Sequence, residues 1–247
     1  MFLRYVFFFV LVFTMVGCQF SETLVLNADG SGTMRIEADL NEMMALGGSA
    51  ALDSTIVKLD TVINMKQFMA EKRDSISKLS AEDQMKLKKI ENFNMGIKMN
   101  SQTSEMVYEI SANFKNIAEV NDMFNGLEQA ANLMPGNKTE AVKTTKEEGS
   151  QELIGVNYSF AKGVFKRDAY IKDKKMHQQQ VDSLEQAAAF MEGSYYTLKY
   201  TFPKKVKNTS NPAATFSADK KTVTVQTPFF EYFRNPDLLD LQVELEK

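Results

Sequence analysis

Strict alternation of apolar and polar residues recurs along the chain and predicts a protein built largely from β-strands. The first two alternating runs, residues 22–27 and 33–40, are separated by Asp29-Gly30, a dipeptide typical of tight hairpin turns. The remaining alternating runs cover residues 93–99, 106–114, 153–160, 164–170, 196–202, 215–227 and 239–245. Most of them follow one another closely, so we expect them to pair as antiparallel hairpins.

Apolar residues spaced three and four apart predict helices between the hairpins. Residues 41–92 show this spacing, with a break at Gly47-Gly48 and a second helix beginning at Ser80. Residues 116–134 carry the most regular stripe, which starts with a capping asparagine and stops before a Pro-Gly pair. A further helix is expected over residues 173–193.

The order of these elements predicts an α+β fold, in which an antiparallel β-sheet built from hairpins is covered by three to four amphipathic helices. Residues 137–150 are polar and charged and predict a loop. The chain from Cys18 onward is long enough for one sizeable domain or two small ones, and we expect residues 23–247 to form a single domain. No period of about 20 to 50 residues repeats along it.

The first 18 residues have the pattern of a secretory signal that ends in a cysteine. Arg4 precedes an apolar run over residues 5–16, which is shorter than the roughly 20 residues that a membrane-spanning helix needs. Residues 15–18, Met-Val-Gly-Cys, resemble the lipobox of bacterial lipoproteins, with Met15 where such boxes usually carry leucine. The resemblance implies a signal peptide over residues 1–17, cleavage before Cys18, two acyl chains on its sulfur and a third on its amine.

Acyl chains such as palmitate on Cys18 are expected to hold the domain close to a membrane. Each buried CH₂ group contributes about 0.8 kcal/mol, so several chains are needed for a stable anchor. Residues 18–22 are interpreted as the acylated cysteine and a short tether. No acidic cluster of the kind that marks surface export follows the cysteine, and we therefore expect the periplasmic face of the outer membrane. The alternative is a plain signal peptide with an incidental cysteine.

The composition argues against nucleic acid as a partner and excludes disulfides as a source of stability. The chain has 29 Lys and Arg against 32 Asp and Glu, with a net charge of −3 and no basic stripe. Removal of residues 1–17 takes away one Arg and leaves −4. Since the single cysteine belongs to the anchor, folding relies on apolar burial.

Residues suited to catalysis or metal binding are sparse. His177 is the sole histidine and has no nucleophile motif around it, and one histidine without a free cysteine excludes the usual zinc sites. The carboxylate pairs Glu82-Asp83 and Glu147-Glu148 lie in polar stretches and are interpreted as solvated surface. Asp29 and Ser31 are assigned to a turn, since a calcium loop needs more oxygen ligands. We expect no catalytic residue, metal or cofactor, and no enzymatic activity.

Methionines at core-like positions leave two interpretations open. Flexible thioethers line adaptable hydrophobic cavities, and they also fill ordinary cores. The positions are Met65, Met69, Met95, Met99, Met106, Met123, Met134, Met176 and Met191.

Asp-Ser/Thr-apolar triplets also allow two interpretations. They begin at Asp53, Asp60, Asp74 and Asp182 and resemble the periplasmic O-glycosylation acceptor of some Gram-negative bacteria. The other interpretation is that they are polar residues on a helix surface next to core residues. We favour it because three of the four triplets lie in helical patterns.

Two stretches near the end of the chain carry a family resemblance. Residues 200–206, Tyr-Thr-Phe-Pro-Lys-Lys-Val, match a Phe-Pro-Gly-x-Val strand end, with Lys204 in place of the glycine. Residues 217–223, Ser-Ala-Asp-Lys-Lys-Thr-Val, match the hairpin that follows it. Together with residues 26–32, they resemble the LppM-like lipoprotein domain family. The resemblance implies an envelope lipoprotein with an α+β lipid-handling fold and no catalytic residues.

These patterns predict a membrane-anchored lipoprotein of the cell envelope without enzymatic activity. Its domain is expected to be structural or to bind an envelope protein partner. The alternative is that it binds or shuttles a lipid or other hydrophobic ligand in a cavity lined by Met and Phe side chains.

Overall fold

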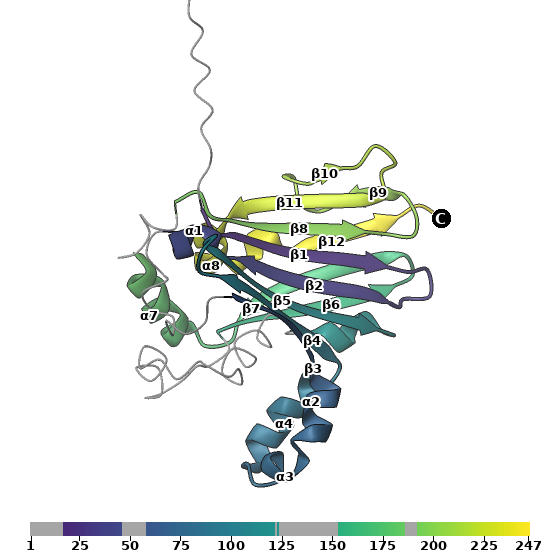
Figure 1. Ribbon diagram of the computed structural model, residues 1–247. Coiled ribbons are helices and arrows are strands. Elements are labelled where there is room, and N and C mark those ends of the chain that lie inside the picture. The colour runs from purple at the N-terminus through teal and green to yellow at the C-terminus, as the bar shows by residue number, and fades with distance from the viewer. Residues whose placement is uncertain (1–16, 46–57, 122, 124–152, 186–191) are drawn as a thin grey trace, which may run out of the picture.

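The computed structural model of the protein describes residues 17–45, 58–121, 123, 153–185 and 192–247 (Figure 1). Twelve strands are found in these residues, and they form two sheets. The eight-stranded sheet has the order β10 (Thr215–Phe216), β11 (Thr222–Pro228), β8 (Tyr195–Thr201), β1 (Gln19–Leu26), β2 (Gly32–Asp39), β5 (Glu105–Phe114), β4 (Phe93–Asn100) and β3 (Lys58–Asn64). The four-stranded sheet has the order β6 (Ile154–Ala161), β7 (Val164–Ile171), β12 (Leu241–Leu245) and β9 (Val206–Thr209).

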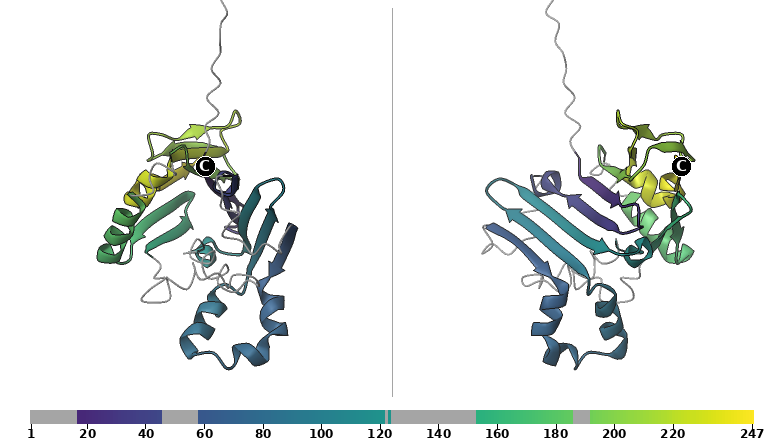
Figure 2. Two further views of the ribbon diagram at one scale, coloured as in Figure 1. Left: turned by 60° about the vertical axis from the view of Figure 1, so that its left-hand side comes forward. Right: turned by 90° about the vertical axis from the view of Figure 1, so that its right-hand side faces the viewer.

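The helices of the described residues are short. They are α1 (Asn41–Ala45), α2 (Met65–Glu71), α3 (Arg73–Ile76), α4 (Ala81–Lys89), α7 (Lys174–Glu185), α8 (Phe229–Arg234) and the 3₁₀ turns η2 (Ile117–Val120) and η4 (Pro236–Leu239). Helices α2, α3 and α4 form a lobe that projects from the sheets, and the left view of Figure 2 shows the two sheets diverging toward this lobe. In the part of the chain that the structure describes, no helix is long and apolar enough to cross a membrane.

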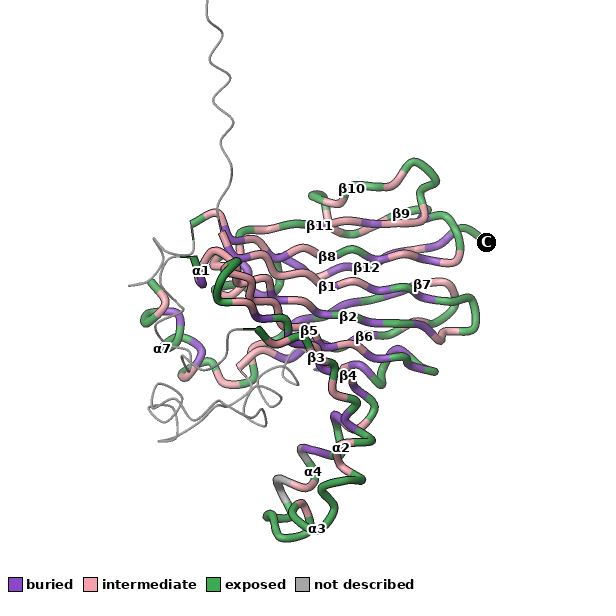
Figure 3. Tube along the Cα trace, viewed as in Figure 1, coloured by how far each residue is buried: buried purple, intermediate pink, exposed green. Residues whose placement is uncertain are grey.

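One hydrophobic core joins the two sheets. Buried and exposed residues alternate along the strands, as Figure 3 shows, because successive side chains of a strand point to opposite faces. Leu24 and Met34 of the eight-stranded sheet and Phe165 and Val243 of the four-stranded sheet belong to the same buried cluster. The protein is therefore α+β, as predicted, but the sheets cover each other to a greater extent than helices cover them.

The prediction of a purely antiparallel sheet is wrong at one position. Strands β1 and β8 pair in parallel, from Gln19 opposite Tyr195 to Val25 opposite Thr201. Nearly 170 residues of chain separate the two strands, so short-range alternation held no information about their pairing. Every other strand pair is antiparallel, and the hairpins β1–β2, β4–β5, β6–β7 and β10–β11 confirm the predicted ones.

Part of the helix predicted over residues 41–92 is a strand. Residues 58–64 form β3, which pairs with β4 at the edge of the eight-stranded sheet. The β-branched run Thr61-Val62-Ile63 favours this strand because such side chains lose rotamer freedom in a helix. The predicted triplet beginning at Asp60 consequently lies on β3, and Val62 is 71% exposed instead of facing a helix core. The helix predicted to start at Ser80 is confirmed as α4.

The helix predicted over residues 173–193 is confirmed as α7 in the described residues, whereas the start of the helix predicted over residues 116–134 is the 3₁₀ turn η2, which ends at Asn121 with non-helical backbone. Asn116 caps η2 in a capping box with Glu119, and the rest of the predicted 116–134 helix lies largely outside the described residues. Asp173 accepts a hydrogen bond from the Met176 N–H at the start of α7. Helix α8 was not predicted, because its aromatic residues carry no three-and-four stripe of core positions. Strand β9 was likewise missed, in a stretch that reads as a polar gap.

Candidate functional site

Cys18 lies immediately before a central strand. Strand β1 begins at Gln19, which pairs with Asp39 of β2 and with Tyr195 of β8. The Tyr195 N–H donates a hydrogen bond to the Cys18 carbonyl at 3.2 Å, and Cys18 is 5% exposed. The short tether predicted over residues 18–22 is thus strand from Gln19 onward. Any group attached to Cys18 is attached directly to the sheet.

The backbone around Cys18 contacts the turn at residues 193–194. The Gln19 side-chain amide donates to the carbonyl of Gly17 at 3.0 Å and to that of Gly193 at 3.3 Å. The Phe229 N–H donates to the carbonyl of Ser194 at 2.9 Å, which joins α8 to the same turn. In the described residues, the Ser194 hydroxyl is the one buried side-chain polar group without a hydrogen-bond partner.

Aromatic side chains gather at this end of the sheet. The rings of Phe20 and Phe229 stack with centroids 4.0 Å apart, and Phe233 stacks on Phe229 at 6.4 Å. The Arg234 guanidinium lies 4.6 Å from the centroid of the Phe230 ring. These rings are partly exposed, so this end of the sheet presents an apolar surface with an arginine beside it.

A buried carboxylate lies three residues into β1. Glu22 is 1% exposed and accepts hydrogen bonds from the hydroxyls of Tyr158 at 2.7 Å, Tyr196 at 3.1 Å and Tyr200. Its Oε2 atom is 3.3 Å from Nη2 of Arg167, whose side chain is 0% exposed. Strands of both sheets therefore converge on one carboxylate.

Arg167 completes the hydrogen bonding of this cluster. Its guanidinium donates to Glu22, to the Leu239 carbonyl at 3.2 Å and to the Tyr232 hydroxyl at 3.2 Å. Burial of a charged pair is tolerated only when the remaining donors and acceptors are satisfied, which is the case here. We refer to Glu22, Arg167, Tyr158, Tyr196, Tyr200 and Tyr232 as the Glu22 cluster.

Burial and charge shift the pKa values of the Glu22 cluster. Burial, reinforced by the nearby charge of Glu22, raises the pKa of Tyr158, Tyr196 and Tyr200 well above the ordinary tyrosine value. Burial is the largest single effect on the pKa of Arg167 and would lower it, but the charge of Glu22 together with the contributions of Tyr232, Tyr200 and Tyr158 outweighs burial and raises that pKa above its usual value. The tyrosines are accordingly neutral hydrogen-bond donors and the arginine is a cation.

The α2–α4 lobe leaves the eight-stranded sheet at the end remote from Cys18. Strands β1, β2, β5, β4 and β3 are successive antiparallel neighbours, so β3 runs in the direction of β1 and delivers the chain to α2 at the far end. Asn64, the last residue of β3, lies in the register row of Thr23, which is about 13 Å beyond Gln19 along β1. Leu79 and Met85 of the lobe are 41% and 63% exposed.

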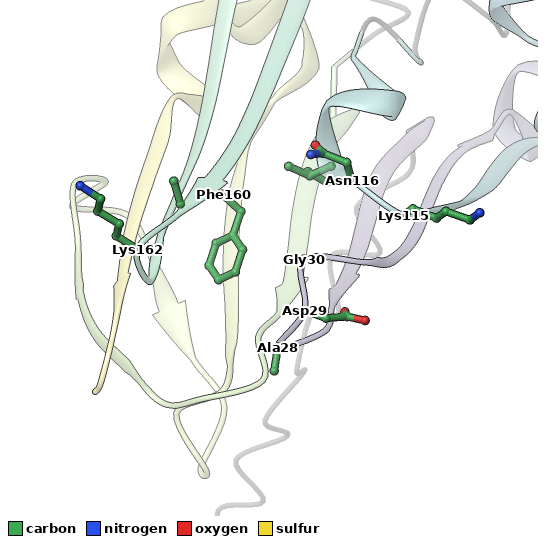
Figure 4. Close-up of a pocket in the computed structure, with 9 residues that line it drawn as sticks. Ala28, Asp29, Gly30, Lys115, Asn116, Phe160 and Lys162 are labelled. Carbon is green, nitrogen blue, oxygen red and sulfur yellow. The ribbon is translucent and has the colours of Figure 1, made fainter.

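A small pocket lies at the same far end, between the tips of the two sheets (Figure 4). Its volume is about 260 Å³, below the range of roughly 300 to 1,000 Å³ typical of ligand sites. The Phe160 ring points into it, whereas Lys115 and Lys162 point away on opposite sides. The two ammonium groups do not converge on one position, so the pocket lacks the geometry of an anion site.

A larger groove of about 510 Å³ lies on the outer face of the four-stranded sheet. Outward-facing polar residues line it, among them Asn157, Ser159, Lys166, Asp168 and Gln242. Burial raises the pKa of Asp240 in this groove, although the Ala169 N–H donates to its carboxylate. This lining suits a polar partner surface and not an acyl chain.

His177 is a buried structural residue. Its Nε2–H donates to the Phe233 carbonyl at 2.7 Å, and its ring lies 5.4 Å from the Phe233 ring. These contacts fasten α7 to α8. In the residues that the structure describes, no group of three or more His, Cys, Asp or Glu side chains is placed to hold a metal ion.

The other residues weighed in the sequence have ordinary surroundings. Asp29 accepts hydrogen bonds from the N–H and hydroxyl of Ser31 within the β1–β2 turn, and these bonds lower its pKa. The triplet at Asp74 lies on α3 and that at Asp182 on α7, while the one at Asp53 lies outside the described residues. The Glu147-Glu148 pair lies outside them too, and Glu82-Asp83 is on α4.

Most of the weighed methionines pack in apolar clusters. Met65, Met95 and Met123 are buried in the main core, Met69 packs against it, and Met99 lies in a second cluster with Ile97 and with Met106 beside it. Met176 is half-buried, and Met134 and Met191 lie outside the described residues. Neither of the two pockets described above is lined by a methionine.

The Glu22 cluster was missed in the sequence, although its signal was present. Glu22 occupies the same alternating positions as Leu24 and Leu26, and Arg167 the same ones as Phe165 and Ala169. A charged residue in the apolar half of an alternating strand indicates a buried charge, which requires a partner. The identity of that partner depended on how the two sheets pack.

Comparisons with known proteins do not assign the chain to a family. No family model matches the chain, and no curated protein matches it. Among solved structures, the folded domain of LppM from Mycobacterium tuberculosis aligns with 93% of this chain and 89% of its own, at 7% sequence identity and a TM-score of 0.38. At this TM-score the likeness carries no inference about function.

Proposed function

We propose that the protein is a non-enzymatic lipoprotein of the bacterial cell envelope, anchored through acyl chains on Cys18. The observation that carries this proposal is the position of Cys18, buried and directly before the central strand β1. Acyl chains on its sulfur and nitrogen would fasten the eight-stranded sheet to the bilayer without an intervening tether. Phe20, Phe229 and Phe233 would then lie at the level of the lipid headgroups.

The domain is proposed to act by binding a protein partner or as a structural element on the periplasmic face of the outer membrane. With Cys18 at the membrane, the α2–α4 lobe points away from it, and its exposed Leu79 and Met85 are available for contact. The polar groove on the four-stranded sheet offers a second surface. Lipid binding is the second candidate, because Met65, Met95, Met99 and Met123 are buried in apolar clusters, Met69 and Met106 pack against them, and neither pocket is lined by a methionine.

Intact mass spectrometry of protein purified from membranes tests the proposal. The expected mass is that of a chain beginning at Cys18 and carrying three acyl chains, and Cys18→Ala should lack this mass and leave the membrane fraction. An unacylated wild-type protein in the soluble fraction would contradict the proposal. A lipid that remains bound under native conditions, beyond the covalent chains, would favour the lipid-binding alternative.

A further inference from the structure

The backbone just before Cys18 passes through a space that admits no side chain. A Cβ atom added to Gly17 would lie 2.3 Å from the carbonyl carbon of Gly193 and 2.5 Å from the nitrogen of Ser194. Both are backbone atoms, which cannot move aside as the end of a side chain can. Only an unbranched carbon therefore fits at the position of the Gly17 Cα atom.

The carbonyl group at this position has a dedicated donor. The Gln19 side-chain amide donates to the Gly17 oxygen at 3.0 Å and lies 3.3 Å from the Gly193 oxygen. Gln19 is itself fixed, because its backbone pairs with β2 on one side and β8 on the other. The sheet thus fixes the backbone from which this donor extends, one residue after Cys18.

A fatty acid on the Cys18 nitrogen has the same local structure as Gly17. Its carbonyl corresponds to the Gly17 carbonyl, and its first methylene corresponds to the Gly17 Cα atom, which is also unbranched. We propose that Gln19, Gly193 and Ser194 form a binding site for the N-acyl amide of Cys18. This inference rests on the proposed function, since cleavage before Cys18 removes Gly17 and exposes the amine to be acylated.

Ser194 provides a second observation for this site. Its side chain is buried, with 2% of the residue exposed, and in the described part of the chain its hydroxyl lacks a hydrogen-bond partner. Its backbone nitrogen borders the Gly17 Cα position. This hydroxyl does not bond to the Gly17 carbonyl, so Gln19 is the side-chain donor for the acyl carbonyl and the Ser194 hydroxyl stays available to a further acceptor at the same turn. A buried polar group without a partner is rare and often marks a place where a further group binds.

The acylation itself is a simple transfer. The Cys18 nitrogen forms a bond to the carbonyl carbon of an acyl ester donor, the ester C–O bond breaks, and the amine proton leaves with the released alcohol. The product amide is neutral. A free amine at Cys18 would instead be an ammonium at a residue with 5% exposure, which costs solvation energy. The Gln19 amide would also lose the nearer of its two acceptors and keep only the Gly193 carbonyl, at 3.3 Å.

Hydrogen exchange on the full chain tests this inference. Two forms purified from membranes are compared: one acylated on sulfur and nitrogen, the other acylated on sulfur alone, from cells that lack the N-acylation step. The readout is the Tyr195 amide, which donates to the Cys18 carbonyl. We expect its exchange to be at least about threefold slower in the N-acylated form, because ordering of the Cys18 amide protects this hydrogen bond.

Gln19→Ala should abolish the difference between the two forms. Gln226→Ala is the matched control, since Gln226 also donates a side-chain hydrogen bond, to Thr197, but lies on β11, and it should preserve the difference. Equal exchange in the two wild-type forms, or a difference that persists in Gln19→Ala, would overturn the inference. The mass of each form is read in parallel, so a chain without acyl groups would identify a failure of the proposed function instead.

Discussion

Glu22 and Arg167 are 145 residues apart in the sequence and form a buried ion pair, 3.3 Å from Oε2 to Nη2, between the two sheets. Glu22 lies on β1, four residues after the proposed acylation site, and Arg167 lies on β7. A buried charge is costly without a partner of opposite charge. This pair therefore favours the one arrangement of the two sheets in which Glu22 and Arg167 meet. Through it, the strand that follows Cys18 is tied to the rest of the domain.

Removing one partner of this pair should destabilise the protein strongly. Arg167→Met leaves the Glu22 charge buried without its cation, and we expect a loss of about 3–5 kcal/mol in the free energy of unfolding. Urea denaturation followed by circular dichroism measures it. The double variant Glu22→Gln/Arg167→Met should lose less than the sum of the two single variants, since it leaves no unpaired charge.

Arg234→Met is the control for the Arg167 variant. Arg234 forms ion pairs with Glu185 and Glu231 at the surface, where its side chain is 44% exposed. Such pairs contribute about 0–1 kcal/mol. A loss in Arg167→Met as small as that in Arg234→Met would contradict the assignment of Arg167 to a buried pair.

The tyrosines of the Glu22 cluster predict a loss of stability at alkaline pH. Burial raises the pKa of Tyr200 above that of the unfolded chain, so the folded protein holds the phenolic proton more tightly. This contribution is complete below about pH 10 and decreases as the pH rises toward the folded pKa, by about 1.4 kcal/mol per pH unit for each such tyrosine. We expect the free energy of unfolding, measured between about pH 9 and 11, to decrease less steeply with pH in Tyr200→Phe than in the wild type.

Tyr200→Phe also removes a hydrogen-bond donor from Glu22. At neutral pH we expect this to destabilise the fold by about 1–3 kcal/mol, because the buried carboxylate keeps its charge with one donor fewer. A variant with wild-type stability at neutral pH and an unchanged alkaline slope would show that Tyr200 is not part of the cluster.

How far the sequence predicted the fold depended on the range of each interaction. The Asp29-Gly30 turn and the Asn116 cap involve neighbours in the chain, and both were predicted correctly. The parallel pairing of β1 with β8 and the pairing of Glu22 with Arg167 join distant segments, and alternation alone does not choose between such partners. β3 was misassigned because its residues fit a helical stripe as well as a strand.

Of the candidate site, the sequence indicated one residue, Cys18. Cys18 was identified from the residues before it, by their resemblance to a lipobox. Its surroundings come from the turn at Gly193 and Ser194, which no local pattern connects with the start of the chain. The burial of Cys18 at the start of a central strand, with no tether, required knowledge of the β1–β8 pairing.

A strand glycine near the far end of β1 provides a test of the packing there. A Cβ atom added to Gly32 would lie 2.1 Å from the Val25 carbonyl oxygen and 2.6 Å from the Phe114 ring. We expect Gly32→Ala to destabilise the protein by more than about 2 kcal/mol. Gly96→Ala is the matched strand control, since its Cβ would meet only the Glu109 side chain, at 3.3 Å. Equal thermal midpoints for the two variants would contradict the described register of β1 and β2.

The central claim is that acyl chains on Cys18 hold the sheet against the membrane with the α2–α4 lobe pointing away. Cys18 is the single cysteine, so once it is acylated, an introduced cysteine is the sole free thiol for a spin label. Glu231→Cys places the label on α8, beside the Cys18 end, and Met85→Cys places it on the lobe. In reconstituted vesicles, relaxation by oxygen and by a water-soluble nickel chelate should put the Glu231→Cys label at the lipid interface and the Met85→Cys label in water. A Met85→Cys label at the lipid, or both labels in bulk water, would contradict the claim.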